Sequence, residues 1–168
     1  QLAGSFFRSF GTPVVTLRPF NTFGPRQSMR AVIPTIVHQL VRDGSVRLGS
    51  LEPIRDMNPV ANTVDAFLRA AETDGIEGET YVVGSGVGLS VGQMVEAVAH
   101  MVGVERPLVS VEDERVRPAG SEVERLICDY SKAAREIGYE PTVTFEEGLA
   151  ATIEYCKQRP EAPSAYAI

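Results

Sequence analysis

The residues whose type and position most suggest chemistry lie in Arg18-Pro-Phe-Asn-Thr-Phe-Gly-Pro25. The amide of Asn21 can both donate and accept hydrogen bonds, which suits a sugar hydroxyl or a phosphate oxygen. This stretch follows the apolar run Pro13–Leu17, which predicts a buried strand, and open α/β sheets bind ligands beyond the carboxyl ends of their strands. The same residues also fit a plain strand exit, in which Asn21 caps backbone groups and Gly24-Pro25 turns the chain. These eight residues alone leave both interpretations open.

Other residues that could take part in chemistry are better explained by structural roles. Gly84-Ser-Gly-Val-Gly88 has the spacing G-x-G-x-G rather than the G-x-G-x-x-G of a dinucleotide-binding loop, and no clear acidic residue follows about twenty positions on. It therefore predicts a tight turn between a strand and a helix. His38 and His100 lie in predicted helices without partners at metal-ligand or triad spacing. Cys128 and Cys156 lack the spacing of a zinc site or a disulfide framework.

Length and composition limit the class of protein. With 168 residues, 43% of them apolar, the chain can form one domain with a sizeable core. Sixteen basic against twenty-two acidic residues give a net charge of -6, which disfavours a nucleic-acid partner. No apolar run is long enough for a membrane span and no signal peptide is visible, so we expect a cytoplasmic protein. The chain begins with Gln within a helical pattern, and we expect it to be part of something longer.

The elements that must position these residues alternate between strand and helix patterns, which predicts an α/β fold. Strands are predicted over residues 14–17, 46–48, 80–83 and 108–111. An apolar periodicity predicts a first helix that ends at Gly11, and the run Ala31–Val37 predicts a second helix with Pro34 at its first position. Four further helices are predicted to begin at caps, which are Asn62, Asp129 and the capping boxes Ser90–Gln93 and Thr144–Glu147.

Four segments, in order, carry a resemblance to a known family. They are Arg18–Pro25, which resembles R-P-x-N-x-Y-G-P; Ala31–Pro34; Arg55-Asp56 followed by Thr63–Phe67; and Arg117–Val123 followed by Cys128–Ala133. Together they resemble the later half of an extended short-chain dehydrogenase/reductase of the NAD-dependent epimerase/dehydratase group. The segments Gly49–Asp56 and Ser121–Arg125 are most similar to 4,6-dehydratases that act on nucleotide-activated N-acetylglucosamine.

The resemblance implies a fold and a set of site residues. We expect residues 1–158 to form the C-terminal part of a Rossmann-like doubly wound sheet plus the small substrate-binding α/β lobe, and residues 159–168 a flexible tail. A nucleoside-diphosphate sugar is the implied partner, and Arg guanidinium groups suit its phosphates. The implied substrate-binding residues are Asn21, Ile33, Arg55, Arg117 and Glu122, with Pro19 and Phe20 at the cofactor.

Alternatives exist for these residues. Arg55 and Arg117 would otherwise be surface side chains paired with carboxylates. Glu122 would be a solvated surface residue, and Ile33 would be a core residue. We expect the two arginines to contact phosphates and Glu122 to accept from ribose hydroxyls. Ile33 and its neighbours would line the base.

The resemblance also indicates what this sequence lacks. The family's Tyr-x-x-x-Lys pair and its glycine-rich first loop are absent from the 168 residues. NAD or NADP would therefore be bound mainly by a preceding N-terminal half, and we expect the chain alone to be inactive. In the intact protein, implied to be a homodimer, the sugar would be oxidised at C4, lose water and regain hydride.

Departures from the family pattern leave two alternatives open. Phe23 replaces the usual Tyr, and Pro59-Val-Ala-Asn62 replaces Tyr-Val-x-Asp. The alternatives are a nucleotide-sugar 4-epimerase or reductase half, and a non-catalytic remnant of the same fold.

Overall fold

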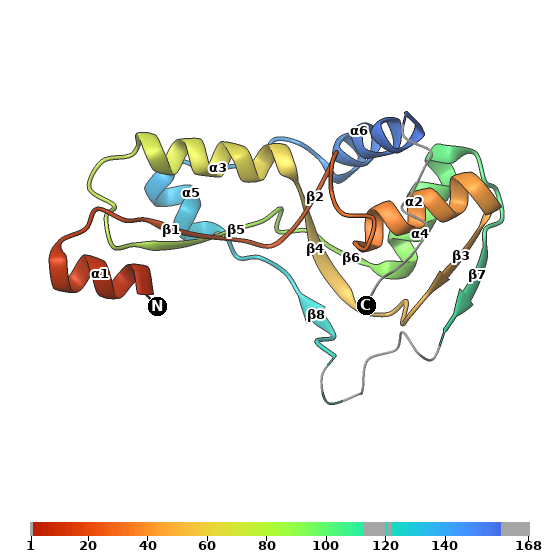
Figure 1. Ribbon diagram of the computed structural model, residues 1–168, viewed down its shortest axis with the longest axis horizontal. Helices are drawn as coiled ribbons and strands as arrows, with labels where there is room; N and C mark the ends of the chain where they lie inside the picture. The colour runs from red at the N-terminus through yellow and green to blue at the C-terminus, as the bar shows by residue number, and fades with distance from the viewer. Residues whose placement is uncertain (1, 113–119, 121, 159–168) are drawn as a thin grey trace.

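The protein is an elongated α/β structure with two lobes joined by a central strand (Figure 1). The computed structural model describes residues 2–112, 120 and 122–158. Arg117 and the predicted tail 159–168 lie outside these residues.

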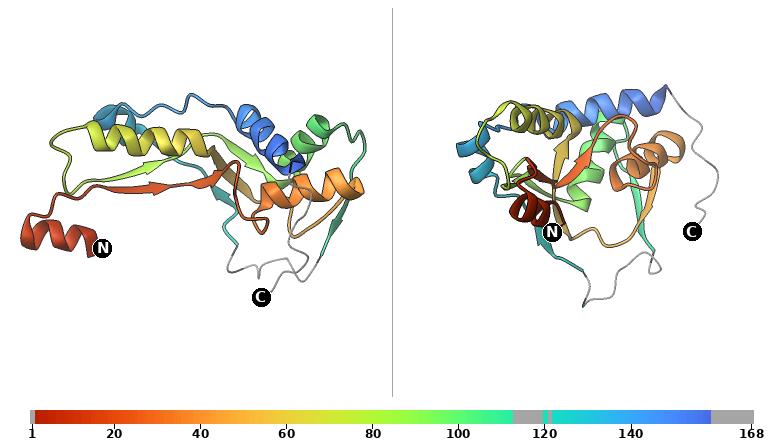
Figure 2. Two further views of the ribbon diagram at one scale, coloured as in Figure 1. Left: turned by 45° about the horizontal axis from the view of Figure 1, so that its top comes forward. Right: turned by 60° about the vertical axis from the view of Figure 1, so that its left-hand side comes forward.

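The first lobe is built on two parallel strands, β1 (Thr16–Pro19) and β5 (Thr80–Val83). Helices α3 (Val60–Glu72) and α5 (Ser131–Ile137) lie on one side of this pair, whereas α1 (Leu2–Phe10) lies apart at the end of the molecule (Figures 1 and 2). The core between strands and helices contains Ala66, Tyr81, Val83, Ala133, Ile137 and Tyr139. No residue of α1 is buried, so this helix adds nothing to that core.

The second lobe packs three helices around a larger core. These are α2 (Val32–Asp43), α4 (Val91–Val102) and α6 (Phe145–Lys157), with the parallel strands β3 (Ser45–Leu48) and β7 (Leu108–Val111) beside them. Both α4 and α6 begin at complete capping boxes, which satisfy backbone N–H groups of the first turn. The core includes Ile33, Ile36, Val37, Leu40, Met94, Val98, Leu149 and Ile153.

Strand β4 (Ile54–Pro59) runs between the lobes and has three short partners. It pairs parallel with β2 (Asn21–Phe23), antiparallel with β6 (Gly88–Ser90) and parallel with β8 (Arg125–Leu126). Segments that are far apart in the sequence therefore meet along one strand, which brings their side chains to a common place.

Most predicted elements are confirmed, and the α/β class with parallel strands is confirmed with them. The motif after the first strand differs. Strand β1 begins at Thr16 and includes Arg18 and Pro19, and Asn21–Phe23 is a strand rather than a loop. The difference arises because β2 gains its hydrogen-bonded partner from β4, more than thirty residues away, which no local pattern indicates.

Three predicted helix starts are wrong in detail. Pro34 is the third residue of α2 rather than the first. A backbone N–H at the third position has no acceptor within the helix, so proline, which lacks the N–H, is tolerated there. Asn62 lies inside the first turn of α3, whose cap position is Pro59, and its amide instead bonds both backbone groups of Val143 (Nδ2 to O 2.8 Å; N to Oδ1 2.9 Å). Asp129 stands one residue before the cap of α5 but still accepts from the Ser131 N–H.

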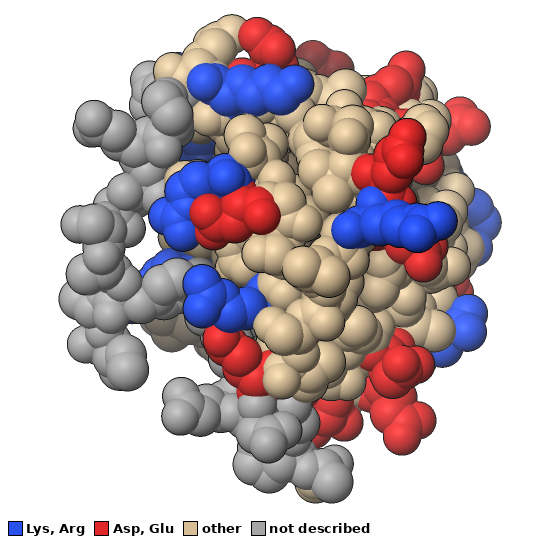
Figure 3. All heavy atoms as spheres, turned by 90° about the vertical axis from the view of Figure 1, so that its right-hand side faces the viewer, with Lys and Arg blue, Asp and Glu red and all other residues tan. Residues whose placement is uncertain are grey.

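Charged side chains of both signs are interspersed on one face of the molecule. At the end of the molecule that carries the second lobe, basic and acidic side chains alternate over a largely uncharged surface, without one continuous basic patch (Figure 3). No helix among the described residues has the length and apolar character needed to cross a membrane.

Candidate functional site

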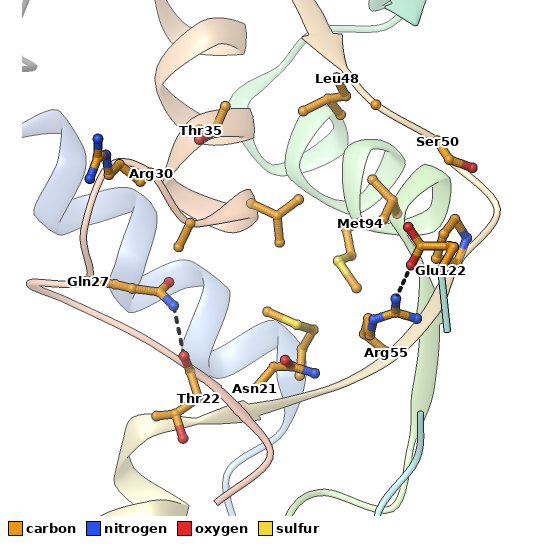
Figure 4. A pocket seen from close by; sticks show the side chains of 16 residues that line it. Asn21, Thr22, Gln27, Arg30, Thr35, Leu48, Ser50, Arg55, Met94 and Glu122 are labelled. Atoms are coloured by element: carbon orange, nitrogen blue, oxygen red, sulfur yellow. Dashed lines mark hydrogen bonds and ion pairs between the residues drawn. The ribbon is translucent and has the colours of Figure 1, made fainter. Parts of the chain in front are cut away.

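A cleft of about 540 Å³ opens between the central strands β2 and β4 and the second lobe (Figure 4). Strands β2 and β4 contribute its floor, and the start of α2, the end of β3 and the start of α4 contribute its walls. Its lining residues are Asn21, Thr22, Gln27, Arg30, Ala31, Val32, Thr35, Leu48, Gly49, Ser50, Pro53, Arg55, Met57, Val91, Met94 and Glu122. Eight of these sixteen residues are polar or charged, so the cleft can offer a ligand both hydrogen bonds and apolar surface.

Asn21 lies at the floor of the cleft, at the start of β2. Its Nδ2 donates to the backbone oxygen of Asp56 on the neighbouring strand, at 3.2 Å. Next to it, the hydroxyls of Thr22 and Thr63 lie 2.9 Å apart, which ties β2 to α3. The amide of Asn21 is thus held in place at the edge of a cavity by a backbone partner, as a ligand-orienting group must be.

Arg55 and Glu122 form an ion pair on the opposite side of the cleft from Gln27 (Figure 4). The Arg55 Nη2 and Glu122 Oε1 atoms are 2.5 Å apart, and the two side chains are 16% and 20% exposed. Arg55 Nη1 also donates to the Ile54 backbone oxygen at 2.9 Å. Two side chains separated by 66 residues in the sequence thus meet, and the guanidinium is held in one orientation at the cleft wall.

The buried carboxylate of Asp56 holds the strands that carry this pair. One Asp56 oxygen accepts from the backbone N–H of Ser85 (2.9 Å) and from the Ser85 hydroxyl (2.6 Å). The other accepts from the N–H groups of Gly86 (2.8 Å) and Cys128 (3.1 Å). Asp56 is fully buried, so these four bonds replace its hydration. They fasten β4 to the turn after β5 and to the segment that follows β8.

Sequence reasoning missed several polar residues of the cleft, notably Gln27, Arg30 and Thr35. Gln27 Nε2 donates to the Thr22 backbone oxygen at 2.8 Å, and its buried Oε1 has no hydrogen-bond partner among the described residues. Thr35 Oγ1 donates to the Met29 backbone oxygen at 2.9 Å. Their sequence signal was weak, because polar residues between a Gly-Pro turn and a helix are typical of any loop.

The structure brings together Asn21, Arg55 and Glu122 from the predicted substrate set, and it places Ile33 elsewhere. The side chain of Ile33 is fully buried in the core of the second lobe, so the expectation that it lines the base is corrected in favour of its core role. Its neighbours Ala31 and Val32 line the cleft instead, because successive residues of a helix point in different directions. Arg117 lies outside the described residues.

Pro19 and Phe20, predicted to contact a cofactor, border a second cavity of about 330 Å³ at the carboxyl end of β1. Arg18, Asn21, Val82 and Leu126 complete its lining, so Asn21 is shared by both cavities. The two spaces therefore adjoin at Asn21. A ligand in one would lie next to a ligand in the other.

Two side chains near Asp56, Cys128 and Tyr139, have raised pKa values, and we assign both a structural role. Burial, followed by the charges of Asp56 and Asp129, raises the pKa of the Cys128 thiol to about 12, so it stays protonated at neutral pH and is a poor nucleophile. Burial also raises the pKa of Tyr139 to about 12, and its hydroxyl donates to the Gly84 backbone oxygen at 2.9 Å. The described part of the chain contains no cluster of three or more His, Cys, Asp or Glu suited to a metal ion.

Comparison with known proteins identifies the family of this chain. The sequence model of the family described as GDP-mannose 4,6 dehydratase matches residues 1–152. The chain belongs to this family. It is thus an extended short-chain dehydrogenase/reductase of the NAD-dependent epimerase/dehydratase group, which confirms the resemblance. A dTDP-glucose 4,6-dehydratase of Actinoplanes is 32% identical over 155 residues, which cover 92% of this chain and 47% of that protein.

Solved structures of this family show the same architecture. A UDP-glucose 4-epimerase of Thermotoga maritima with UDP-glucose superposes with a TM-score of 0.81 at 31% identity, covering 94% of this chain and 50% of that one. A UDP-glucuronic acid 4-epimerase of Bacillus cereus, in complex with UDP-glucuronic acid and NAD, gives a TM-score of 0.84 at 25% identity, covering 94% and 49%. The Rossmann-like α/β class is thereby confirmed. The chain spans about half the length of the curated relatives it matches.

Proposed function

We propose that this chain is the substrate-binding portion of a nucleotide-sugar 4,6-dehydratase. The observation that carries the proposal is the convergence of Asn21, Arg55 and Glu122 in one cleft, from three segments that are distant in the sequence. An amide, a guanidinium and a carboxylate match the three polar parts of a nucleoside-diphosphate sugar, which are sugar hydroxyls, phosphates and ribose hydroxyls.

Each residue has a defined role in this proposal. The Asn21 amide, at the junction of the two cavities, orients the sugar or its first phosphate. Arg55 binds phosphate oxygens, and Arg117 supplies a second cation. Glu122 accepts from ribose hydroxyls. The backbone and apolar surface at Ala31, Val32 and Leu48 hold the base.

The residues at the end of β1 fit the edge of a nicotinamide cofactor. Their cavity is mainly apolar, with Pro19, Phe20 and Val82 in its lining, and it adjoins the substrate cleft at Asn21. A flat ring would pack against such a wall, and the juxtaposition would set it beside the sugar. NAD or NADP, when bound, supplies hydride acceptance and return. This chain's residues would orient the sugar toward it.

The reaction we propose for the intact protein is oxidation of the sugar at C4, elimination of water across C5 and C6, and return of hydride to C6. The 168 residues contain neither Tyr-x-x-x-Lys nor the family's glycine-rich first loop, so we expect the chain alone to bind substrate without turnover. Nucleotide-activated N-acetylglucosamine is the proposed substrate, on the similarity of residues 49–56 and 121–125 to that subgroup. A cytoplasmic homodimer is the proposed form of the full-length protein.

A nucleotide-sugar 4-epimerase is the second candidate. It is favoured by a UDP-glucose 4-epimerase of known structure among the relatives, at 31% identity. Both candidates need the same substrate cleft. They differ in acid and base groups, most of which would precede residue 1.

Calorimetric titration with UDP- and GDP-N-acetylglucosamine, with the corresponding glucose nucleotides in parallel, tests the binding assignment. We expect binding, and a loss of about 10- to 100-fold in affinity for Arg55→Gln and for Arg117→Ala, since a charge-assisted hydrogen bond contributes about 1.5–3 kcal/mol. Arg69→Gln is the matched control, because Arg69 also pairs with a carboxylate but lies on α3, outside the cleft. A folded protein that binds none of these nucleotides would refute the assignment.

A further inference from the structure

We propose that Thr63 is a positioning residue for the cleft, because it passes a directed chain of hydrogen bonds to the backbone that carries Asn21. Thr63 lies near the start of α3 and is not among the residues that line the cleft. Its hydroxyl nevertheless lies 2.9 Å from the hydroxyl of Thr22, which does line the cleft. The inference rests on the proposed function, since it concerns how residues of the same cleft are oriented toward a nucleotide sugar.

The backbone groups of Val143 fix the first link of the chain. The Asn62 amide bonds both of them, with Oδ1 accepting from the Val143 N–H at 2.9 Å and Nδ2 donating to the Val143 oxygen at 2.8 Å. A backbone N–H can only donate and a carbonyl oxygen can only accept, so the Asn62 amide has one possible orientation. Its Nδ2 also donates to Asn58 Oδ1, at 3.1 Å. Both asparagines are buried, so these polar groups depend on one another rather than on water.

The orientation of Asn62 determines the direction of the later bonds. Because Asn58 Oδ1 accepts from Asn62, the Asn58 Nδ2 group is the donor toward Thr63 Oγ1, at 3.2 Å. The Thr63 hydroxyl accepts this bond and donates its own proton to the Thr22 hydroxyl. The Thr22 hydroxyl then donates to the Phe20 backbone oxygen at 3.2 Å. This direction satisfies both hydroxyls, and the chain ends at a carbonyl oxygen, which can only accept.

The end of the chain lies where the two cavities adjoin. Phe20 lines the second cavity and Thr22 lines the cleft, so the bond between them spans Asn21, which belongs to both. The Thr22 backbone oxygen is held separately, by Gln27 Nε2 at 2.8 Å (Figure 4). Thr63 therefore stabilises the conformation of the backbone from which the Asn21 amide projects.

Calorimetric titration with UDP- and GDP-N-acetylglucosamine, each beside its free nucleoside diphosphate, tests the inference. The variant is Thr63→Val, which keeps the shape of the side chain and ends the chain of hydrogen bonds at Asn58. We expect its affinity for the nucleotide sugar to fall about fivefold, as when one neutral hydrogen bond is lost. Its affinity for the free diphosphate should stay unchanged, because the proposed phosphate and base contacts do not involve Asn21. Thr63→Ser keeps the hydroxyl and should restore the wild-type ratio of the two affinities.

Thr152→Val is the matched control. Thr152 is also a buried threonine, but its hydroxyl donates to the Gly148 backbone oxygen at 2.7 Å within α6, outside the cleft. This variant should lower the melting temperature without changing the ratio of the two affinities. Thr22→Val interrupts the chain one link later and should lower the same ratio, so it replaces Thr63→Val if that variant does not fold.

Two outcomes would overturn the inference and leave the proposed function intact. One is an unchanged ratio in the folded variant that interrupts the chain, and the other is a lowered ratio that Thr63→Ser does not restore. A folded wild-type protein that binds none of the four ligands would overturn both the inference and the proposed function.

Discussion

Replacing Asp56 with asparagine should destabilise the protein by about 3 kcal/mol, because an amide cannot serve the four donors that meet there. The carboxylate accepts two bonds on each oxygen, from Ser85 on one side and from Gly86 and Cys128 on the other. Asparagine has one acceptor oxygen. If that oxygen faces Gly86 and Cys128, the amide group faces Ser85, whose hydroxyl can turn to accept but whose backbone N–H cannot.

The magnitude follows from this count. At least one backbone N–H loses its acceptor, which costs about 1–3 kcal/mol, and the remaining bonds lose the extra strength of an ionised acceptor. A loss of about 3 kcal/mol corresponds to a fall of about 6–12 °C in Tm for a chain of this size. Urea unfolding followed by circular dichroism measures the change directly.

The control for this prediction is Asp65→Asn, which breaks a partly exposed ion pair on α3 and should cost less than about 1 kcal/mol. If Asp56→Asn unfolds at the same urea concentration as this control, the buried carboxylate does not fasten β4 to its neighbours. The account of how Arg55 and Glu122 are positioned would then fail too, since it depends on that anchor.

Three further predictions follow from local contacts. Gly84→Ala should cost about 2 kcal/mol or more, because its Cβ would lie 2.5 Å from the Cys128 Cβ. Gly92→Ala, whose Cβ meets nothing closer than 3.7 Å, should be tolerated, and equal stability of the two variants in urea would contradict this. Thr144→Ala should cost about 1 kcal/mol in urea through loss of the helix cap, and an unchanged midpoint would argue against that bond. The free energy of unfolding should fall between pH 9 and 12, because native Cys128 and Tyr139, with pKa values of about 12, keep protons that the unfolded chain releases; a flat profile there would exclude this effect.

The elements that depend on residues close together in the sequence could be predicted. Both capping boxes, the first helix and the stop at Gly138 follow from residues within a few positions of one another, and all are present. Strand β5 was equally clear from its apolar β-branched pattern. Family motifs added Asn21 and Arg55, whose roles no periodicity indicates.

Features that depend on distant partners could not be predicted. The Arg55–Glu122 pair requires β8 to lie beside β4, and a two-residue strand has no sequence pattern of its own. Asn62 looked like a helix cap because asparagine prefers that place, yet its partner is Val143, 81 residues away. The side chain of Ile33 could have faced either the core or the cleft. Only the packing of α2 against its neighbours places it in the core.

The apolar residues of α3 are not its buried ones. Val64, Phe67 and Leu68 recur at helical spacing, but they are 51%, 51% and 57% exposed. The buried face carries Thr63, Ala66 and Ala70 instead. These small side chains pack into the core of the first lobe, so the orientation of the helix is set by contacts that the hydrophobic pattern does not reveal.

A crystal structure of the protein with UDP-N-acetylglucosamine tests the central claim most directly. The account predicts the nucleotide in the cleft between the central strands and the second lobe, with a phosphate oxygen within hydrogen-bond distance of Arg55, a ribose hydroxyl on Glu122 and the sugar directed toward Asn21 and the end of β1. Nucleotide bound elsewhere, or bound in the cleft without a phosphate contact to Arg55, would contradict it.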